Sequence, residues 1–167
     1  MKKQKGFSLI ELLIVVAIIL IIAAIAIPNL LRARISANEA SAVGSVRTIV
    51  TGEVSYQAAG WTNNGAPVGY SAALGDLGGN NCNPPTVNST CLIDPILAQA
   101  NTAATAKSGY FFAYAPVASG GVNTGFTINA NPATPGQTGS RYFFADQSGV
   151  IRFNPAAPAA VTDNPIQ

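Results

Sequence analysis

The strongest pattern in the chain is a run of apolar residues near its N-terminus. From Phe7 to Ile27 every residue is hydrophobic except Ser8 and Glu11. The twenty residues that begin at Phe7 would form a helix about 30 Å long, which matches the hydrocarbon thickness of a bilayer. The run therefore predicts a membrane-spanning helix. Such a helix does not explain Glu11, because a charged side chain at the bilayer centre costs about 2.5–3.5 kcal/mol.

Beyond this run, apolar residues recur every three or four positions, which is the spacing of an amphipathic helix. The stripe consists of Leu31, Ile35, Ala42, Val46, Ile49 or Val50, and Val54, with Arg32, Arg34, Asn38, Glu39, Ser41 and Arg47 mostly between its members. Pro28 removes one helical hydrogen bond and crowds the preceding turn, so we expect a kink or break there. One helix is thus predicted over residues 7–59, and the glycine-rich residues 60–65 end it.

The C-terminal half alternates apolar and polar residues, which predicts β-strands. These strands cover residues 110–115, 125–130, 141–146 and 150–153, and residues 146–149 form a favourable hairpin turn. A short helix or turn is expected over residues 93–100. The tail from Asn154 is rich in Pro and Ala and is predicted to be extended. The predicted fold is α+β, a long N-terminal helix packed on an antiparallel sheet of three to four strands.

Most aromatic residues fall in the predicted strands. They are Tyr110, Phe111, Phe112, Tyr114, Phe126, Tyr142, Phe143, Phe144 and Phe153. They could form a binding or electron-carrying surface, or they could form the sheet core and its cross-strand pairs. The alternation favours the core.

Composition and charge narrow the function classes. The formal charge is +2, but three of the nine basic residues are Lys2, Lys3 and Lys5. Without residues 1–6, six basic residues face seven acidic ones, so the remainder carries −1. The remaining basic residues form no stripe, and no nucleic-acid site is evident.

The chain has two cysteines, Cys82 and Cys91, and their spacing is too wide for a CxxC redox or zinc pair. A disulfide that closes a small loop is the favoured interpretation, with two free thiols as the alternative. A disulfide implies an oxidising compartment outside the cytosol. Three N-terminal lysines place the N-terminus in the cytoplasm and the rest of the chain outside.

Two ordinary interpretations of the apolar run fit it poorly. A secretory signal peptide has a shorter apolar region, although Ala24-Ile25-Ala26 loosely matches its cleavage site. A plain membrane anchor leaves Glu11 without a purpose. An intramembrane carboxylate is a candidate functional group whose partner has to be identified.

The residues around Glu11 supply a more specific interpretation. The stretch Lys5-Gly6-Phe7-Ser8-Leu9-Ile10-Glu11, continued by Ile27-Pro28-Asn29-Leu30-Leu31, resembles the class III signal of type IV pilins and pseudopilins. The resemblance implies a leader over residues 1–6, cleavage between Gly6 and Phe7 by a prepilin peptidase, and N-methylation of Phe7. It also implies a helix over 7–59, whose residues 7–27 span the membrane and later form a filament core, and a globular head over 60–167.

This resemblance gives Glu11 a role in assembly. After cleavage, the new Phe7 ammonium of one subunit could pair with the Glu11 carboxylate of the next. An unpaired charge in a low dielectric is costly, so such a pair would fix the axial register of the subunits. Two features depart from the family. Leu20 stands where a helix-loosening glycine is usual, and the cysteines lie mid-chain instead of near the C-terminus.

Catalytic chemistry is scarce in this sequence. The chain has no histidine, which excludes Ser-His and Cys-His catalysis, and no phosphate-binding glycine loop fits its pattern. We expect no enzyme activity, no cofactor and no metal. Calcium binding near Asp146 and Asp163, as in some pseudopilins, is a weaker hypothesis that spacing alone does not support.

The function predicted from the resemblance is that of a type IV pilin, a homopolymer used for adhesion, twitching motility or DNA uptake. The implied partners are the prepilin peptidase, the inner-membrane assembly platform with its ATPases, and the membrane before assembly. The precursor is expected in the inner membrane with its head in the periplasm, and the assembled protein in a surface pilus. The alternatives are a major pseudopilin of a type II secretion system and a membrane-anchored periplasmic binding module.

Overall fold

The computed structural model describes residues 7–80 and 82–166, so the predicted leader and Gly6 lie outside the described residues. The chain divides into two compact units, Met1–Arg34 and Ile35–Gln167. Helix α1 (Leu9–Ala58) contributes to both and agrees closely with the helix predicted over residues 7–59. The helix continues through Pro28, so the expected break is wrong, and the kink at Pro28 stays a prediction.

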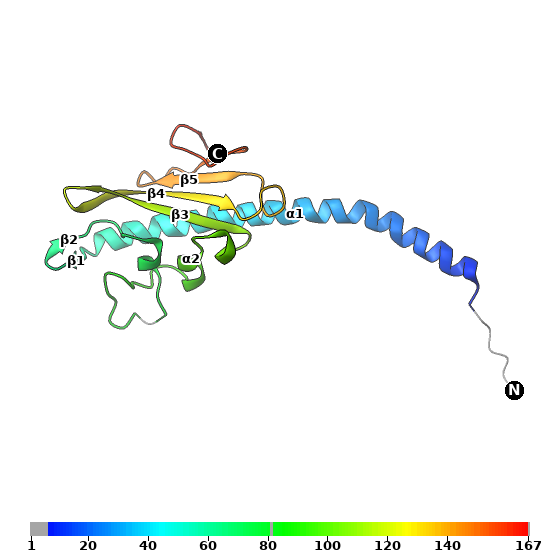
Figure 1. Ribbon diagram of the computed structural model, residues 1–167, viewed down its shortest axis with the longest axis horizontal. Helices are drawn as coiled ribbons and strands as arrows, with labels where there is room; N and C mark the ends of the chain where they lie inside the picture. The colour runs from blue at the N-terminus through cyan, green and yellow to red at the C-terminus, as the bar shows by residue number, and fades with distance from the viewer. Residues whose placement is uncertain (1–6, 81, 167) are drawn as a thin grey trace. The chain divides into compact units, whose positions relative to one another are not determined.

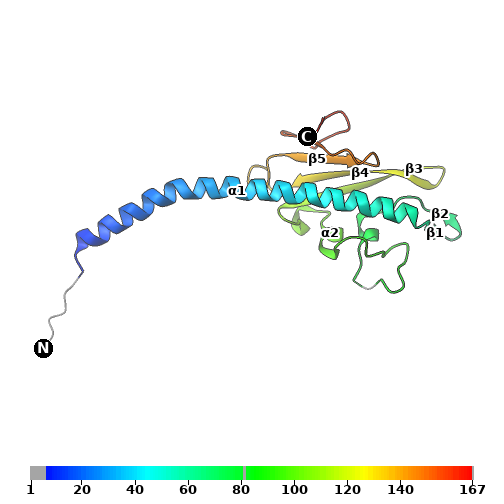
Figure 2. The same ribbon diagram turned by 180° about the vertical axis from the view of Figure 1, so that it is seen from behind.

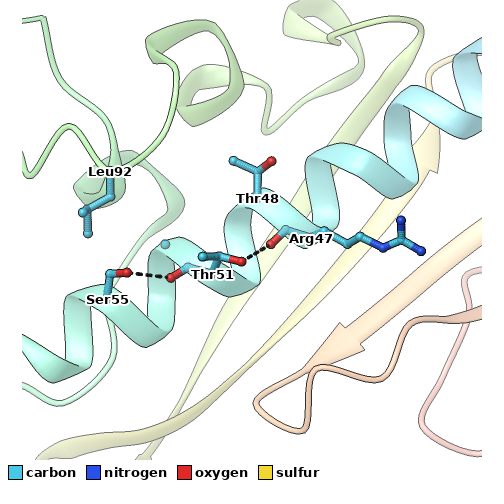
Figure 3. A pocket seen from close by; sticks show the side chains of 6 residues that line it. Arg47, Thr48, Thr51, Ser55 and Leu92 are labelled. Carbon is cyan, nitrogen blue, oxygen red and sulfur yellow. Dashed lines mark hydrogen bonds between the residues drawn. The ribbon is translucent and has the colours of Figure 1, made fainter.

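In the second unit, α1 has one buried and one exposed face. Thr48, Thr51 and Ser55 stand on the exposed face (Figure 3). The buried face differs from the predicted stripe at an apolar position and at two acidic positions. Val54 was expected to be buried but is 51% exposed, whereas Glu39 and Glu53 are buried. The spacing of apolar residues correctly predicted the helix, but it did not predict that two of its acidic side chains are buried in the head.

The described part of the second unit forms a five-stranded antiparallel sheet in the order β3-β4-β5-β6-β7. Its strands are β3 (Tyr110–Ser119), β4 (Val122–Pro132), β5 (Tyr142–Asp146), β6 (Arg152–Asn154) and β7 (Asn164–Pro165). The second half of α1 runs along one face of this sheet, as Figures 1 and 2 show from opposite sides. The predicted α+β class is therefore confirmed.

The sheet has one strand more than the three to four expected. The additional strand, β7, comes from the tail that was predicted to be merely extended. It pairs with β6 through Arg152–Pro165 and Phe153–Asn164. A turn closed by the Asp163 carboxylate, which accepts the Ala160 N–H at 2.8 Å, returns the chain to the sheet edge.

The connection between β5 and β6 is the predicted hairpin turn. The Gly149 N–H donates to the Asp146 carbonyl at 3.0 Å, and Gly149 has a φ of +74°. The Asp146 carboxylate accepts the Ser148 N–H at 2.9 Å. Glycine is favoured here because other residues rarely adopt a positive φ.

Short elements occupy the segment between α1 and β3. The strands β1 (Thr62–Asn63) and β2 (Ala66–Pro67) pair with each other. The segment also contains the 3-10 helices η1 (Leu74–Leu77) and η2 (Ala103–Thr105) and the short helix α2 (Pro95–Gln99). Helix α2 lies inside the segment predicted over residues 93–100. Its start follows from local chemistry, because Asp94 accepts the Ile96 N–H at 3.1 Å and Pro95 is the first helical residue.

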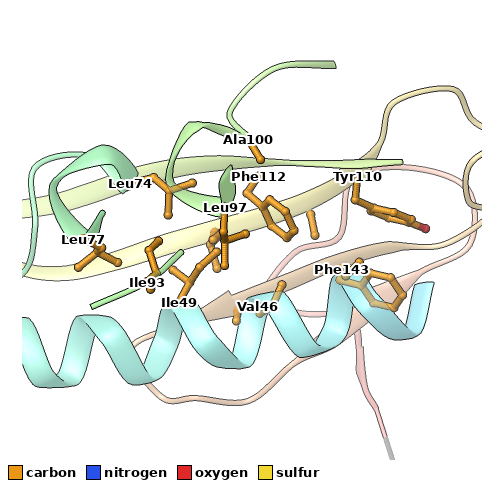
Figure 4. Close-up of a cluster of buried hydrophobic side chains, with 14 of the residues drawn as sticks. Val46, Ile49, Leu74, Leu77, Ile93, Leu97, Ala100, Tyr110, Phe112 and Phe143 are labelled. Atoms are coloured by element: carbon orange, nitrogen blue, oxygen red, sulfur yellow. The ribbon is translucent and has the colours of Figure 1, made fainter. Parts of the chain in front are cut away.

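The core lies between α1, the sheet and the segment around η1 and α2 (Figure 4). Val46 and Ile49 of α1 are fully buried against it. The inner face of the sheet contributes aromatic side chains, and the intervening segment contributes Leu77 and Leu97. The fully buried aromatic residues of the sheet are Tyr110, Phe112, Phe126 and Phe143. These aromatics thus serve as core, as the alternation favours.

Candidate functional site

The first unit presents an apolar surface with no core of its own among residues 7–34. Every helical residue from Leu9 to Arg34 is exposed except Ala23, which is half-buried. Phe7 is 85% exposed, and Leu20 is 63% exposed. Helix α1 is long and apolar enough to cross a membrane. Isolated exposed apolar residues are ordinary on protein surfaces, but a continuous helical surface of this kind is typical of a lipid-facing or assembly-facing segment.

Glu11 has a hydrogen-bond partner within the first unit. The Ser8 N–H donates to Oε2 of Glu11 at 3.0 Å. Since α1 begins at Leu9, Ser8 is the N-cap residue and Glu11 is the third helical residue, the arrangement of one half of a capping box. The sequence analysis missed this bond, although Ser8-Leu9-Ile10-Glu11 fits the S-x-x-E signal. The bond satisfies a backbone donor that would otherwise be unpaired at the helix start.

A second exposed surface is formed by the outer face of α1 in the second unit (Figure 3). The hydroxyls of Thr48, Thr51 and Ser55 donate to the backbone carbonyls four residues earlier, at 2.9–3.0 Å. Each hydroxyl donor is therefore satisfied within the helix. An apolar neighbour could cover this face without leaving these donors unpaired.

Glu39 joins α1 to the loop that precedes β5. Its Oε1 accepts the backbone N–H groups of Ser140 and Arg141 at 2.9 and 3.1 Å. Its Oε2 forms a salt bridge with Nε of Arg141 at 2.8 Å. The guanidinium also lies over the rings of Phe143 and Phe153, at 5.6 and 5.7 Å from their centroids. A buried charge is thus compensated by three hydrogen bonds.

Glu53 is the other buried acid of α1, and its partners are different. The Ser71 N–H donates to Oε2 of Glu53 at 3.1 Å, and Ser71 Oγ is hydrogen-bonded to Oε1 at 2.5 Å. Burial raises the pKa of the Glu53 carboxyl, and the hydrogen bonds from Ser71 offset only part of that increase. Burial also raises the pKa of the Asp76 carboxyl on η1.

The loop between η1 and α2 is closed by a disulfide between Cys82 and Cys91, which is the predicted pairing. Hydrogen bonds from α1 and to η1 attach this loop to its surroundings. The Tyr56 hydroxyl on α1 donates to the Val87 carbonyl at 2.8 Å, and the Thr90 N–H donates to the Asp76 carbonyl at 3.0 Å.

Asp146 and Asp163, the residues considered for calcium, each cap a turn of their own. Over the described residues, no group of three or more His, Cys, Asp or Glu side chains is arranged to hold a metal ion. Asp163 also accepts a bond from the Asn154 side chain at 3.1 Å. The structure thus gives both acids a local structural role.

The chain was compared with known proteins. Residues 1–27 match the family described as the prokaryotic N-terminal methylation motif. A relative, the type IV wide pilus major component PilA4 of Thermus thermophilus, is 45% identical over 78 residues, which cover 47% of this chain and 56% of that protein. The type IV major pilin protein PilA of Myxococcus xanthus is 43% identical over 54 residues, 32% of this chain and 24% of that protein. The search of solved structures gave no significant match.

Proposed function

We propose that the chain is a type IV pilin, the repeating subunit of a type IV pilus. The chain spans about half of one curated relative and a quarter of the other. The main support for the proposal is the combination of the N-terminal methylation motif with a helix whose apolar residues are exposed all round in the first unit.

The apolar segment suits both the membrane-bound precursor and the subunit in the filament. In the precursor it spans the inner membrane, and in the filament it packs against helices of other copies. One apolar environment replaces the other, so the transfer is decided by packing and polar contacts between helices. The outer face of α1 around Thr48 and Thr51 suits such packing because its hydroxyls are already satisfied.

Glu11 supplies the polar contact in this proposal. A prepilin peptidase cleaves after Gly6 and frees the α-amino group of Phe7, which keeps its positive charge after N-methylation. The Phe7 ammonium of one subunit then pairs with the Glu11 carboxylate of another. Because a mis-stepped subunit would leave both charges unpaired, the pair selects one axial register. An assembly platform and its ATPases supply the work of extension.

Mass spectrometry of filaments sheared from intact cells tests this proposal. We expect a polymer of this chain whose subunits begin with N-methylated Phe7. A mature chain that begins at Ile27, after the Ala24-Ile25-Ala26 sequence, would contradict processing at Gly6. Deletion of the gene should remove surface fibres. Secretion failure with intact fibres would instead identify a pseudopilin.

A further inference from the structure

Glu53 is a fully buried carboxyl group that the proposed assembly mechanism does not use. Its exposed fraction is 0%, as is that of its partner Ser71. The charged or titratable groups that act on it are Asp76 on η1 and Tyr114 on β3. Tyr56, one turn further along α1, is also close enough to respond to the Glu53 charge. Over the described residues, none of these neighbours is basic, so the site contrasts with the Glu39–Arg141 salt bridge.

Ser71 lies between Glu53 and the hydroxyl of Tyr114. The Tyr114 hydroxyl donates to the Ser71 carbonyl at 3.0 Å. Ser71 Oγ lies 2.5 Å from Glu53 Oε1, 3.1 Å from the Ala73 carbonyl and 3.1 Å from Tyr114 Oη. The Ala73 carbonyl also accepts the Asp76 N–H at 3.1 Å, and the Ser71 carbonyl accepts from the Asn123 side chain at 3.1 Å, so neither carbonyl depends on the serine proton.

A protonated Glu53 fits this network, and its full burial beside an acidic group and, among the described residues, no basic one favours that form. Its Oε1–H can donate to Ser71 Oγ, which frees the serine proton for the Ala73 carbonyl or for Tyr114 Oη. The Ser71 N–H still donates to Oε2 at 3.1 Å. We infer that the folded head holds Glu53 in its protonated form, so that folding takes up one proton and alkaline pH weakens the attachment of the η1 segment to α1.

The direction of the pH effect follows from burial. Removal from water disfavours the charged carboxylate and raises the pKa of Glu53 in the folded chain, and the nearby Asp76 carboxyl raises it further. The contribution to stability is therefore complete below the pKa of the unfolded carboxyl, at about 4.3. It is lost as the pH rises through the higher pKa of the folded state.

The hydrogen bonds of Asp76, close to Ser71 in the sequence, indicate which part of the head would loosen. Asp76 accepts the N–H groups of Ala72 and Ala73 at 3.1 and 2.9 Å, and its own carbonyl accepts from Thr90. Ionisation of Glu53 would thus disturb a chain of bonds that leads from α1 through η1 to the disulfide loop. Hydrogen exchange should show this segment opening before the sheet does.

The test is urea unfolding of the full chain in non-ionic detergent, followed by the fluorescence of Trp61. This residue is the single tryptophan, and its ring packs 6.1 Å from that of Tyr56 in the head. Between about pH 4 and pH 9, the folding constant of the wild type should fall by up to tenfold per pH unit for the one proton released. The Glu53→Gln variant has an amide that can still donate to Ser71 Oγ. Over the same pH range, the total fall in its folding constant should be at least tenfold smaller than in the wild type. Asp146→Asn, in an exposed turn, is the matched control and should follow the wild type.

Two outcomes would overturn the inference. One is a Glu53→Gln variant with the same pH profile as the wild type. The other applies even if that variant does not fold, and uses the wild-type chain with ¹³C-labelled glutamate carboxyls. The sequence has three glutamates, and one carboxyl signal should keep its protonated shift at neutral pH. If all three signals titrate in the ordinary glutamate range, Glu53 is ionised in the fold.

Discussion

At the scale of single residues, the acidic side chains of this chain act mainly as partners for its own backbone. The sequence contains seven acidic residues, and each accepts a hydrogen bond from a backbone N–H. They are Glu11, Glu39, Glu53, Asp76, Asp94, Asp146 and Asp163. In a chain with only 10% charged residues, carboxylates are thus placed where a turn, a cap or a helix contact needs an acceptor.

The Glu39–Arg141 contact gives a prediction at this scale. Glu39→Ala should lower the free energy of unfolding of the head by about 2–3 kcal/mol, because it removes the acceptor of two backbone donors and of Arg141. Arg141→Ala should cost less, because the Glu39 carboxylate keeps its two backbone bonds. Urea unfolding followed by Trp61 fluorescence measures both losses.

Arg141→Lys separates charge from shape in the same experiment. Lysine keeps the positive charge but lacks the planar group that lies over Phe143 and Phe153. We therefore expect the free energy of unfolding of Arg141→Lys to lie between that of the wild type and that of Arg141→Ala. Equal stability of Arg141→Ala and Glu39→Ala would contradict a primary role for the backbone bonds.

At the scale of elements, the two glycines of α1 in the second unit lie in opposite surroundings. A Cβ at Gly44 would meet no atom within 4 Å, whereas one at Gly52 would lie 3.0 Å from Cγ2 of Ile93. Ile93 is only 5% exposed and has little room to move. Gly44 is thus a residue of the exposed face, and Gly52 allows the η1–α2 segment to approach the helix.

This difference predicts opposite effects of one substitution. Gly44→Ala should raise the free energy of unfolding by about 0.5–1 kcal/mol, the ordinary gain for alanine over glycine inside a helix. Gly52→Ala makes the same helical gain but crowds Ile93, and overpacking typically costs about 1–3 kcal/mol. We expect a net loss for Gly52→Ala in urea unfolding. A stabilised Gly52→Ala would show that Ile93 relaxes freely.

Local pattern was sufficient to predict the long helix, the α2 segment and the β5–β6 hairpin. Their signals are short-range: an apolar period, an Asp-Pro start and a turn that ends in Gly149. Strand β7 was missed because two residues carry no alternation and its pairing with β6 depends on a turn made by Asp163. The burial of Glu53 was missed because its partner, Ser71, lies eighteen residues away in an irregular segment.

At the scale of the whole molecule, the two units differ in whether they bury their apolar residues. The second unit has a core of its own between α1 and the sheet. The described residues of the first unit expose theirs, as is typical of a segment that faces lipid or another protein. Sequence alone identified the apolar run and its methylation motif, because both are contiguous. It did not show that Glu11 already bonds to Ser8 within its own subunit.

This bond leads to a prediction that separates capping from assembly at residue 11. Glu11→Gln keeps a side-chain oxygen that can accept the Ser8 N–H, but it removes the charge that would pair with Phe7. We expect the variant to accumulate in the membrane as a processed chain and to form at least tenfold fewer filaments, counted by electron microscopy and immunoblotting of sheared material. Ser8→Ala is the matched control, because it retains the backbone N–H and should assemble normally. Normal filament numbers in Glu11→Gln would assign the carboxylate to helix capping, and register selection would then rest on helix packing alone.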